Sequence, residues 1–174
     1  MAIYKFEGKV PKINPSAYVH ENAQVIGDVV IGDHCYVGAG AIIRGDNCSV
    51  RIGDRVAVEE GCIIHAPDGE TCSIGSDILL GHGALVHCAQ IGSWVRLGIG
   101  AIIGIWAVIE DWVVIAEGTV VPNKKTMVSG QVYVGNPAKA IRPLSEEERK
   151  ATPYGIQIYA DLCDRYRTGL ERLD

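Results

Sequence analysis

The sequence predicts an all-β solenoid, in which short parallel strands coil around a narrow core, followed by a helical tail. The first observation is an aliphatic residue that recurs every six positions through most of the chain. A helix repeats every 3.6 residues and a half-buried strand every 2, so this period fits neither alone. The second is that glycine follows many of these positions, where tight corners tolerate little else. The recurring aliphatic residues are Ile13, Val19, Val25, Ile31, Val37, Ile43, Ile52, Val58, Ile64, Ile74, Leu80, Val86, Ile91, Leu97, Ile103, Ile109, Ile115 and Val121.

Each repeat unit supplies one short strand and one corner, and three units are expected to close one triangular turn. The aliphatic side chain points inward and stacks on its equivalent one turn above, at the spacing of about 4.8 Å that separates paired strands. Backbone groups pair between successive turns, as in other solenoids. The steps after Ile43, Ile64 and Val86 are nine, ten and five residues instead of six. None of these interruptions makes room for a large loop.

The coil with its exit segment is expected over residues 1–143, and a helical segment packed on it over residues 144–174. Ser145 and Glu148 have the spacing of a capping box, which predicts the start of a helix. Pro153 and Gly155 are expected to end that helix, and a second helix is expected over residues 156–173. One face of the second helix should pack along the flank of the coil, and its apolar positions are Ile158, Leu162, Tyr166 and Leu170.

The composition excludes several classes of function. The formal net charge of −5 argues against nucleic acid or an anionic membrane as a partner. No stretch approaches the ~18 consecutive apolar residues of a membrane span. The N-terminal segment lacks the apolar core of a signal peptide. We therefore expect a cytoplasmic protein whose six cysteines are free thiols, because that compartment is reducing.

Three of the five histidines occupy related positions in the repeat. His65 and His87 directly follow the inward residues Ile64 and Val86, so their imidazoles should lie one turn apart on the same face. His82 lies on the preceding face near a corner and should point away from this pair within one chain. A neighbour in a threefold trimer could bring its own His82 across. The spacing suggests a three-histidine site split between subunits, and three imidazoles plus a solvent ligand are typical of catalytic zinc.

Arg44 and Asp46 extend the same column by one turn. Arg44 should lie in line with His65 and His87, and Asp46, two residues further along the strand, faces the same way. The pair fits a catalytic role or a structural ion pair at a trimer interface, because structural pairs also gather at sites. The remaining histidines do not join the column and are interpreted as ordinary surface or core residues: His20 and His34.

These motifs resemble the γ-class carbonic anhydrase family of hexapeptide-repeat proteins. The resemblance rests on the Arg-Gly-Asp segment 44–46, on His65 and on the segment 81–87, and it extends over residues 10–142. It implies a left-handed coil, a sense that runs against the usual right-handed crossover. The tail also carries a helix pattern similar to that family, Tyr159-x-x-Leu162-x-x-x-Tyr166.

The resemblance implies a homotrimeric, zinc-dependent carbonate dehydratase, which is a lyase. His65 and His87 of one subunit and His82 of the next would bind zinc, or iron or cobalt in its place. The metal would lower the pKa of its bound water to around 7, and the resulting hydroxide would attack CO₂ to give bicarbonate. Arg44 and Asp46 would form a salt bridge across the subunit interface, next to the metal.

Some positions depart from that family. Glu59 stands in place of the glutamine that orients the hydroxide, and a carboxylate accepts a hydrogen bond but donates none unless it is protonated. Glu59 is either a solvated charge or a group that approaches the metal from the adjacent subunit. Tyr159 either packs the helix or reaches the site. The metal ligands are thus intact while the hydration machinery is altered, and the other departures are Ala57, Glu60, Cys88 and Ile158.

Two other functions remain open on this fold. An acyl-CoA-dependent acyltransferase would use one catalytic histidine, although the missing large loop insertion counts against it. A non-catalytic metal-binding trimer would serve as an accessory protein. Metal content separates the acyltransferase from the other two functions, and CO₂ hydration separates the carbonic anhydrase from the accessory protein.

Overall fold

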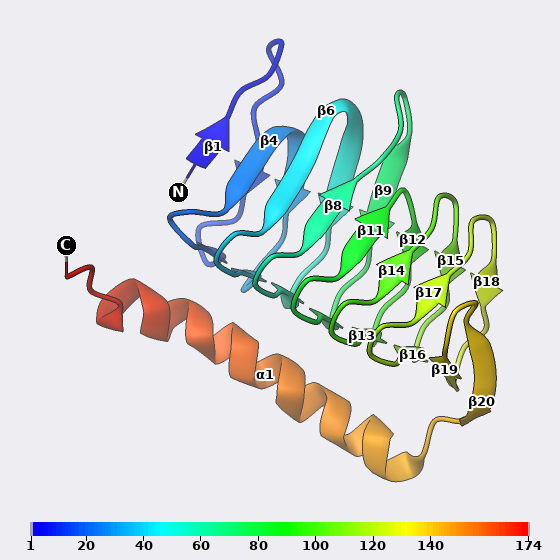
Figure 1. Ribbon diagram of the computed structural model, residues 1–174. Helices are drawn as coiled ribbons and strands as arrows, with labels where there is room; N and C mark the ends of the chain where they lie inside the picture. Colours follow the sequence, from blue (N-terminus) through cyan, green and yellow to red (C-terminus); the bar gives the residue numbers. More distant parts are fainter. Residues whose placement is uncertain (1, 174) are drawn as a thin grey trace.

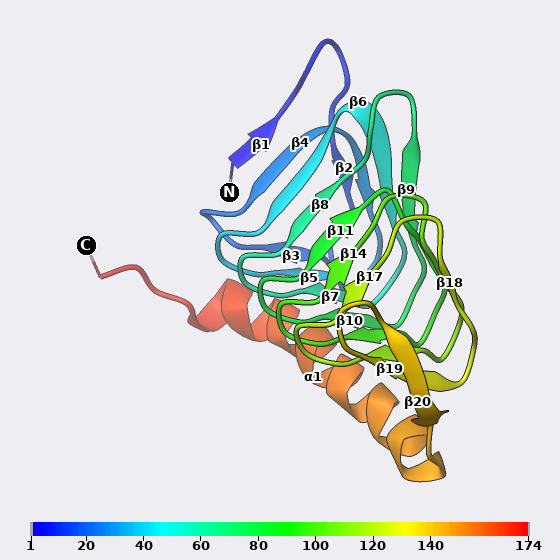
Figure 2. The ribbon, with the colours of Figure 1, turned by 45° about the vertical axis from the view of Figure 1, so that its right-hand side comes forward.

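The six-residue period builds a triangular coil of strands, as the sequence predicts (Figure 1). The computed structural model describes residues 2–173. Strands of successive turns pair in parallel, and among the strands of these residues only the last pair is antiparallel. Figure 2 looks more nearly along the coil and shows the three faces of each turn. The predicted solenoid is therefore confirmed.

The strands divide among three faces, and the two longest strands, β4 (Gln24–Ile31) and β6 (Ile42–Ile52), bend around the corner between the first face and the second. The first face is continued by β8 (Ile63–His65), β11 (Leu85–His87), β14 (Ile102–Ile103) and β17 (Val120–Val121). The second face adds β2 (Lys12–Ile13), β9 (Thr71–Ile74), β12 (Gln90–Ile91), β15 (Val108–Ile109) and β18 (Thr126–Met127).

The third face has one strand per turn and ends in the antiparallel pair. Its strands are β3 (Tyr18–Val19), β5 (Tyr36–Val37), β7 (Val56–Val58), β10 (Ile78–Leu80), β13 (Arg96–Leu97), β16 (Val114–Ile115) and β19 (Gln131–Val134). β20 (Lys139–Pro143) pairs antiparallel with β19, and at the other end β1 (Ala2–Tyr4) pairs with β4.

The core is a set of stacked aliphatic columns, one for each face. On the first face, Ile43, Ile64 and Ile103 have no exposed surface, and Val86 lies between the last two. Small residues such as Ala41 fill the space beneath the corners. Burying one such aliphatic side chain stabilises the fold by about 1.5–3 kcal/mol, so the repeat stabilises every turn in the same way.

Glycine follows the inward residues because the turns stack closely there. A Cβ atom on Gly53 would lie 2.6 Å from the carbonyl oxygen of Gly75, and one on Gly75 would lie 2.6 Å from that of Gly92. None of these three glycines has a positive φ. The positive φ of the corners falls on other residues, among them Gly83 and Trp94. The glycines therefore lie at the positions that the sequence predicts. They are required there because neighbouring backbones approach closely, and not because the chain needs a positive φ.

The tail is one helix, α1 (Glu146–Gly169), and the expected break at Pro153 and Gly155 is wrong. The start is as predicted, because Ser145 and Glu148 form a complete capping box. Pro153 removes one backbone donor, while the neighbouring Thr152 hydroxyl donates to the carbonyl oxygen of Glu148. Packing against the coil holds the helix through the proline: Thr152, Ile156, Ala160 and Cys163 are buried.

The face of α1 that meets the coil also differs from the predicted one. Ile158 and Leu170 are 42 % and 53 % exposed, and Leu162 and Tyr166 are half-buried. The prediction assumed a helix that began after Gly155 and that turned Ile158 toward the coil. In the continuous helix, the residues that face the coil are instead Ile156, Ala160 and Cys163. α1 packs on the third face along β3, β5, β7 and β10, so the expectation that the tail lies along the flank is correct. Within residues 2–173, no helix is long and apolar enough to cross a membrane.

Replacing Pro153 with alanine should raise the free energy of unfolding by about 1–2 kcal/mol. Alanine restores the backbone N–H donor that proline lacks, and in a helix interior proline is about 3 kcal/mol less favourable than alanine. Part of this difference is offset because proline lowers the conformational entropy of the unfolded chain. Guanidinium unfolding measures the change. Substituting Pro143 with alanine, before the helix begins, is the control and should have a smaller effect. A loss of stability in P153A would show that proline is favoured at this point.

Candidate functional site

His65 and His87 lie side by side at the edge where the first face meets the second, because they are the last residues of β8 and β11. Each follows an inward residue, on β8 and β11, and the two are paired in register. Their rings stack with centroids 5.5 Å apart and an interplanar angle of 16°. Burial, followed by the nearby charge of Arg44, lowers the pKa of His65 below its ordinary value. A neutral imidazole is the form that binds a metal ion.

Arg44 and Asp46 lie on β6, one turn before His65. The Arg44 guanidinium donates to one oxygen of the Asp46 carboxylate, and the other oxygen lies 3.4 Å from His65 Nε2. Burial opposes ionisation of Asp46, but the backbone N–H of Asn47 and the Arg44 guanidinium outweigh it and lower the pKa of Asp46. We call Arg44, Asp46, His65 and His87 the first half-site.

Cys48 joins this group without having been singled out in the sequence. The ligand atoms of Asp46, Cys48 and His65 all lie within 4.8 Å of one another. The Cys48 thiol is buried, lies 3.4 Å from the carbonyl oxygen of Arg44, and has its pKa raised mainly by burial. The signal was its position two residues after Asp46 on the same strand.

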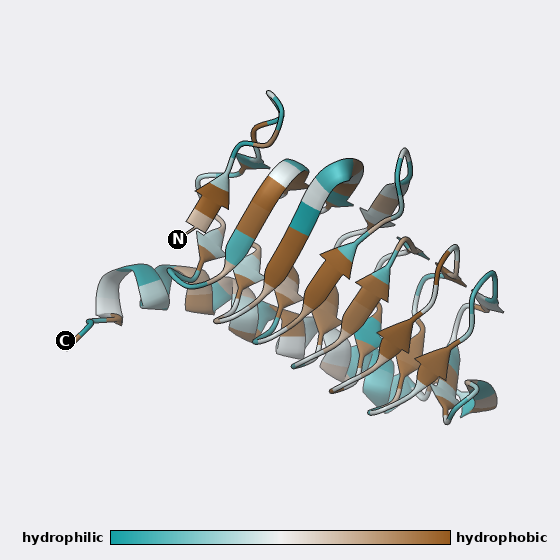
Figure 3. Ribbon diagram, turned by 45° about the horizontal axis from the view of Figure 1, so that its top comes forward, coloured by the Kyte–Doolittle hydropathy of each residue, from teal (hydrophilic) through white to brown (hydrophobic). Residues whose placement is uncertain are grey.

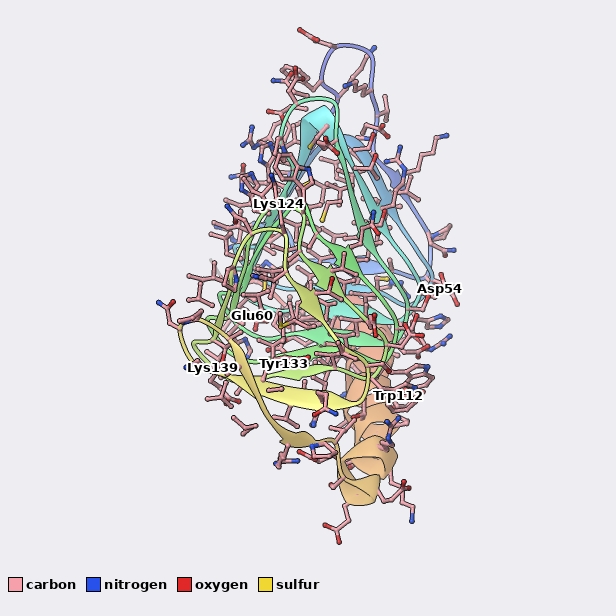
Figure 4. All side chains as sticks on the ribbon, turned by 90° about the vertical axis from the view of Figure 1, so that its right-hand side faces the viewer. Asp54, Glu60, Trp112, Lys124, Tyr133 and Lys139 are labelled. Atoms are coloured by element: carbon pink, nitrogen blue, oxygen red, sulfur yellow. The ribbon has the colours of Figure 1, made fainter. Side chains whose placement is uncertain are left out.

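His82 lies at the opposite edge of the first face, at the corner that follows β10. Its Nδ1 is 2.7 Å from a carboxylate oxygen of Glu60, and its Nε2 is 3.1 Å from one of Glu59. In Figure 4, Glu60 lies on the opposite side of the coil from Asp54 and Trp112. We call Glu59, Glu60 and His82 the second half-site.

Glu59 is held in place from two directions. It is only 6 % exposed, and it accepts a hydrogen bond from the backbone N–H of His82 at 3.0 Å. Tyr159 of α1 lines the same groove, and burial, followed by the interaction with Glu59, raises the pKa of the Tyr159 phenol. Glu60 in turn accepts a hydrogen bond from Tyr36 at 2.9 Å. Tyr159 therefore reaches this cluster as well as packing the helix, and the parts played by Glu60 and Tyr36 were missed.

Within one chain the two half-sites remain apart. Among residues 2–173, no ion pair or ring contact joins His82 to His65 or His87, and the cluster of metal-binding atoms around Asp46 does not include His82. The other histidines lie elsewhere: His20 contacts Asn22, and His34 pairs with Asp33. A three-histidine centre would therefore need a second copy of the chain.

A groove of about 520 Å³ opens between the third face and α1, next to the second half-site. Glu59, His82 and Tyr159 line one part of it, and Arg96 and Arg142 line another. Any ligand held in the groove would thus lie close to His82.

Comparisons with known proteins agree with this architecture. A family model described as bacterial transferase hexapeptide (six repeats) matches residues 11–45. The chain is 40 % identical over 163 residues to Protein YrdA of Escherichia coli (strain K12), which covers 90 % of this chain and 89 % of the relative. It is 32 % identical over 170 residues to the carnitine operon protein CaiE of Proteus sp. (strain LE138), covering 98 % of this chain and 86 % of the relative.

A solved structure extends the comparison to three dimensions. It is a protein described as a putative acetyltransferase of Bacillus cereus, is 30 % identical, and superposes with a TM-score of 0.94 over 96 % of this chain and 97 % of the other. The six-residue repeat and the coil define a hexapeptide-repeat protein. The chain belongs to the hexapeptide-repeat family that includes YrdA and CaiE.

Proposed function

We propose that this chain is a γ-carbonic-anhydrase-like metalloenzyme that hydrates CO₂ reversibly as a homotrimer. In this proposal the coil is left-handed, the protein is cytoplasmic, and a zinc ion, or iron or cobalt, is held between subunits. His65 and His87 of one subunit and His82 of the next are the ligands. The observation that carries the proposal is the stacked, in-register pair of His65 and His87 at the edge of the first face.

The chemistry of the donors fits this metal. Two imidazoles one turn apart supply two of the three nitrogen ligands typical of catalytic zinc. The nearby Asp46 carboxylate is engaged by Arg44, and the buried Cys48 thiol donates to the carbonyl oxygen of Arg44 at 3.4 Å. Neither group competes well as a third ligand, so that position is left for a histidine from another subunit. His82 is suited to it because its side chain is 49 % exposed.

The outer surface of the first face supports a trimer. On β6, β8, β11, β14 and β17 an aliphatic residue precedes the inward one and belongs to an outward column, and the last four of these strands are mostly brown in Figure 3. Ile63 and Ile102 are each 41 % exposed in the single chain. Exposed apolar surface of this kind is typical of a subunit interface. The column separates the two half-sites and consists of Ile42, Ile63, Leu85, Ile102 and Val120.

The residues of the two half-sites have distinct tasks in this proposal. A bound zinc ion would supply a water ligand whose pKa is lowered to about 7. Glu59, fixed by Tyr159 and by the backbone of His82, would orient water beside His82 Nε2 by accepting its hydrogen bond at the carboxylate. Glu60 orients the His82 ring through Nδ1, and Arg44 balances the charge of Asp46 beside His65. Metal ligands commonly depend on such outer partners.

The test is metal content per trimer together with stopped-flow CO₂ hydration, on protein purified anaerobically and then loaded with zinc. We expect three metal ions per trimer and clear hydration. Metal without hydration would favour the accessory protein. If the purified and zinc-loaded protein contains no metal, acyl transfer becomes the favoured function.

Replacing Glu59 with glutamine should raise the kcat/KM for CO₂ hydration by about tenfold, because the amide can donate as well as accept a hydrogen bond. Stopped-flow hydration on the zinc-loaded variant measures it. Glu147→Gln, at an exposed glutamate of α1, is the matched control and should leave the rate unchanged. An unchanged rate in E59Q with metal fully loaded would contradict this role for Glu59.

Acyl transfer is the second candidate, and the descriptions of the family model and of one solved structure support it more directly than they support CO₂ hydration. The family model is one of transferases, and the Bacillus cereus structure carries an acetyltransferase title. One geometric observation also favours it: Glu60 contacts Nδ1 of His82 and could orient the ring so that Nε2 acts as a general base. A thiol-release assay with acetyl-CoA and a panel of amines and alcohols tests it, and His82→Ala should abolish any turnover found.

A further inference from the structure

The floor of the groove between the third face and α1 contains an arginine without a full set of partners. Arg96 lies on β13 in the outward column of the third face, between Leu79 and Val114. Within residues 2–173, its Nε is the buried side-chain nitrogen that lacks a hydrogen-bond partner. Its nearest carboxylate, that of Glu148, is 3.9 Å from Nη2, which is beyond hydrogen-bond distance. A buried donor left unpaired costs free energy, so this position favours an incoming acceptor.

Glu148 does not neutralise Arg96 because its oxygens are already used. Arg142 donates to both of them, at 2.7 and 2.8 Å, and the backbone N–H of Ser145 donates at 2.9 Å. The Arg142 guanidinium, followed by the Ser145 backbone, holds the pKa of Glu148 at about 2. Glu148 is therefore paired with Arg142, and Arg96 has no carboxylate within hydrogen-bond distance.

The rest of the groove limits what can bind there. Leu79 and Val114 flank Arg96 on the strand side, and Ile99, 55 % exposed, lines the groove as well. Glu59 and Glu117 also line it and would repel a doubly charged anion. The groove as a whole thus has no positive surplus, and the local feature that matches a ligand is the Arg96 guanidinium, whose Nε lacks a partner and which lies between two apolar side chains. A planar guanidinium in such surroundings suits a singly charged carboxylate with an apolar body.

We propose that this groove is a binding site for a small aliphatic carboxylate, whose carboxylate group pairs with Arg96 and whose apolar body lies along Leu79 and Val114. The groove borders the proposed metal ligand His82, but the carboxylate is held by Arg96 and the proposal does not depend on CO₂ hydration. Its occupant would lie between the coil and α1, close to His82 and Tyr159.

The test is isothermal titration of the native oligomer with hexanoate, before and after treatment with a chelator. We expect saturable binding that persists without metal, because the carboxylate pairs with Arg96 and not with a metal ion. Hexan-1-ol, which has the same apolar body without the charge, should not bind measurably. Binding that disappears with the metal, or no saturable binding of hexanoate, would overturn the proposal.

Three variants sharpen the test. Arg96→Gln should weaken hexanoate binding by about tenfold, the loss expected for one charge-assisted hydrogen bond. Glu148→Gln should tighten binding several-fold, because it frees Arg142 while glutamine still completes the capping box. Arg165→Gln, at an exposed arginine of α1 outside the groove, should leave the affinity unchanged. Equal affinities of R96Q and the native protein, with circular dichroism unchanged, would refute the role of Arg96.

Discussion

Replacing His87 with alanine is expected to remove the bound metal while the trimer survives. The substitution leaves two imidazole ligands out of three in the proposed centre. Loss of an outer partner of a ligand alone lowers metal affinity by about 10–100-fold, so loss of the ligand should exceed 100-fold. The backbone of β11 and the buried Val86 are unchanged, and the apolar column of the first face remains intact. The coil and its proposed interface should therefore persist.

The measurement is zinc per trimer by elemental analysis after dialysis, with molar mass by light scattering. His34→Ala is the matched control, because His34 is an exposed histidine paired with Asp33 and lies outside both half-sites. It should keep three metal ions per trimer. Full metal retention in H87A would rule out the shared centre, and loss of the trimer in H87A would show that the ring also supports assembly.

Replacing Ile109 with alanine should lower the free energy of unfolding by about 2–5 kcal/mol, the range for isoleucine to alanine in a packed core. Ile109 is 1 % exposed and is stacked between Ile91 and Met127 in the column of the second face. The coil has no second layer that could collapse into the space left behind. Guanidinium unfolding at one protein concentration measures the loss, because the stability of an oligomer depends on concentration.

Val108→Ala is the neighbouring control on the same strand. Val108 points outward and is only half-buried, so its truncation should cost well under half as much. Equal losses at the two positions would mean that the inward column does not carry the stability of the coil. The pair thus tests the period-of-six pattern residue by residue.

The coil could be predicted from the sequence because every turn repeats the same local requirement. An inward residue such as Ile64 is recognisable from the six-residue step alone, and the structure buries it completely. The helix break at Pro153 could not be predicted correctly in the same way. The local cost of proline is visible in the sequence, but the burial of Ile156 and Cys163 against the coil is not. Long-range packing outweighed the local signal.

The candidate site likewise has contacts that the repeat predicts and contacts that depend on long-range packing. The pairing of His65 with His87 follows from equal positions in consecutive turns, which the repeat makes readable. The hydrogen bond between Tyr36 and Glu60 joins residues from different turns, and Tyr159 meets Glu59 across the boundary between coil and helix. No period relates such residues, so their contacts emerge only from the folded chain.

Because α1 runs along the flank as a single helix, its length must match the number of turns in the coil. α1 begins beside the last turns, and its far end reaches the first, where Arg167 donates to the carbonyl oxygen of Ala17 and Cys163 lies against that of Cys35. A duplication that added one turn to the coil would satisfy every rule of the repeat. It would also slide Tyr159 out of register with Glu59. The helix therefore limits the number of turns, and lineages that lengthen or shorten the coil would have to change the length of the helix at the same time.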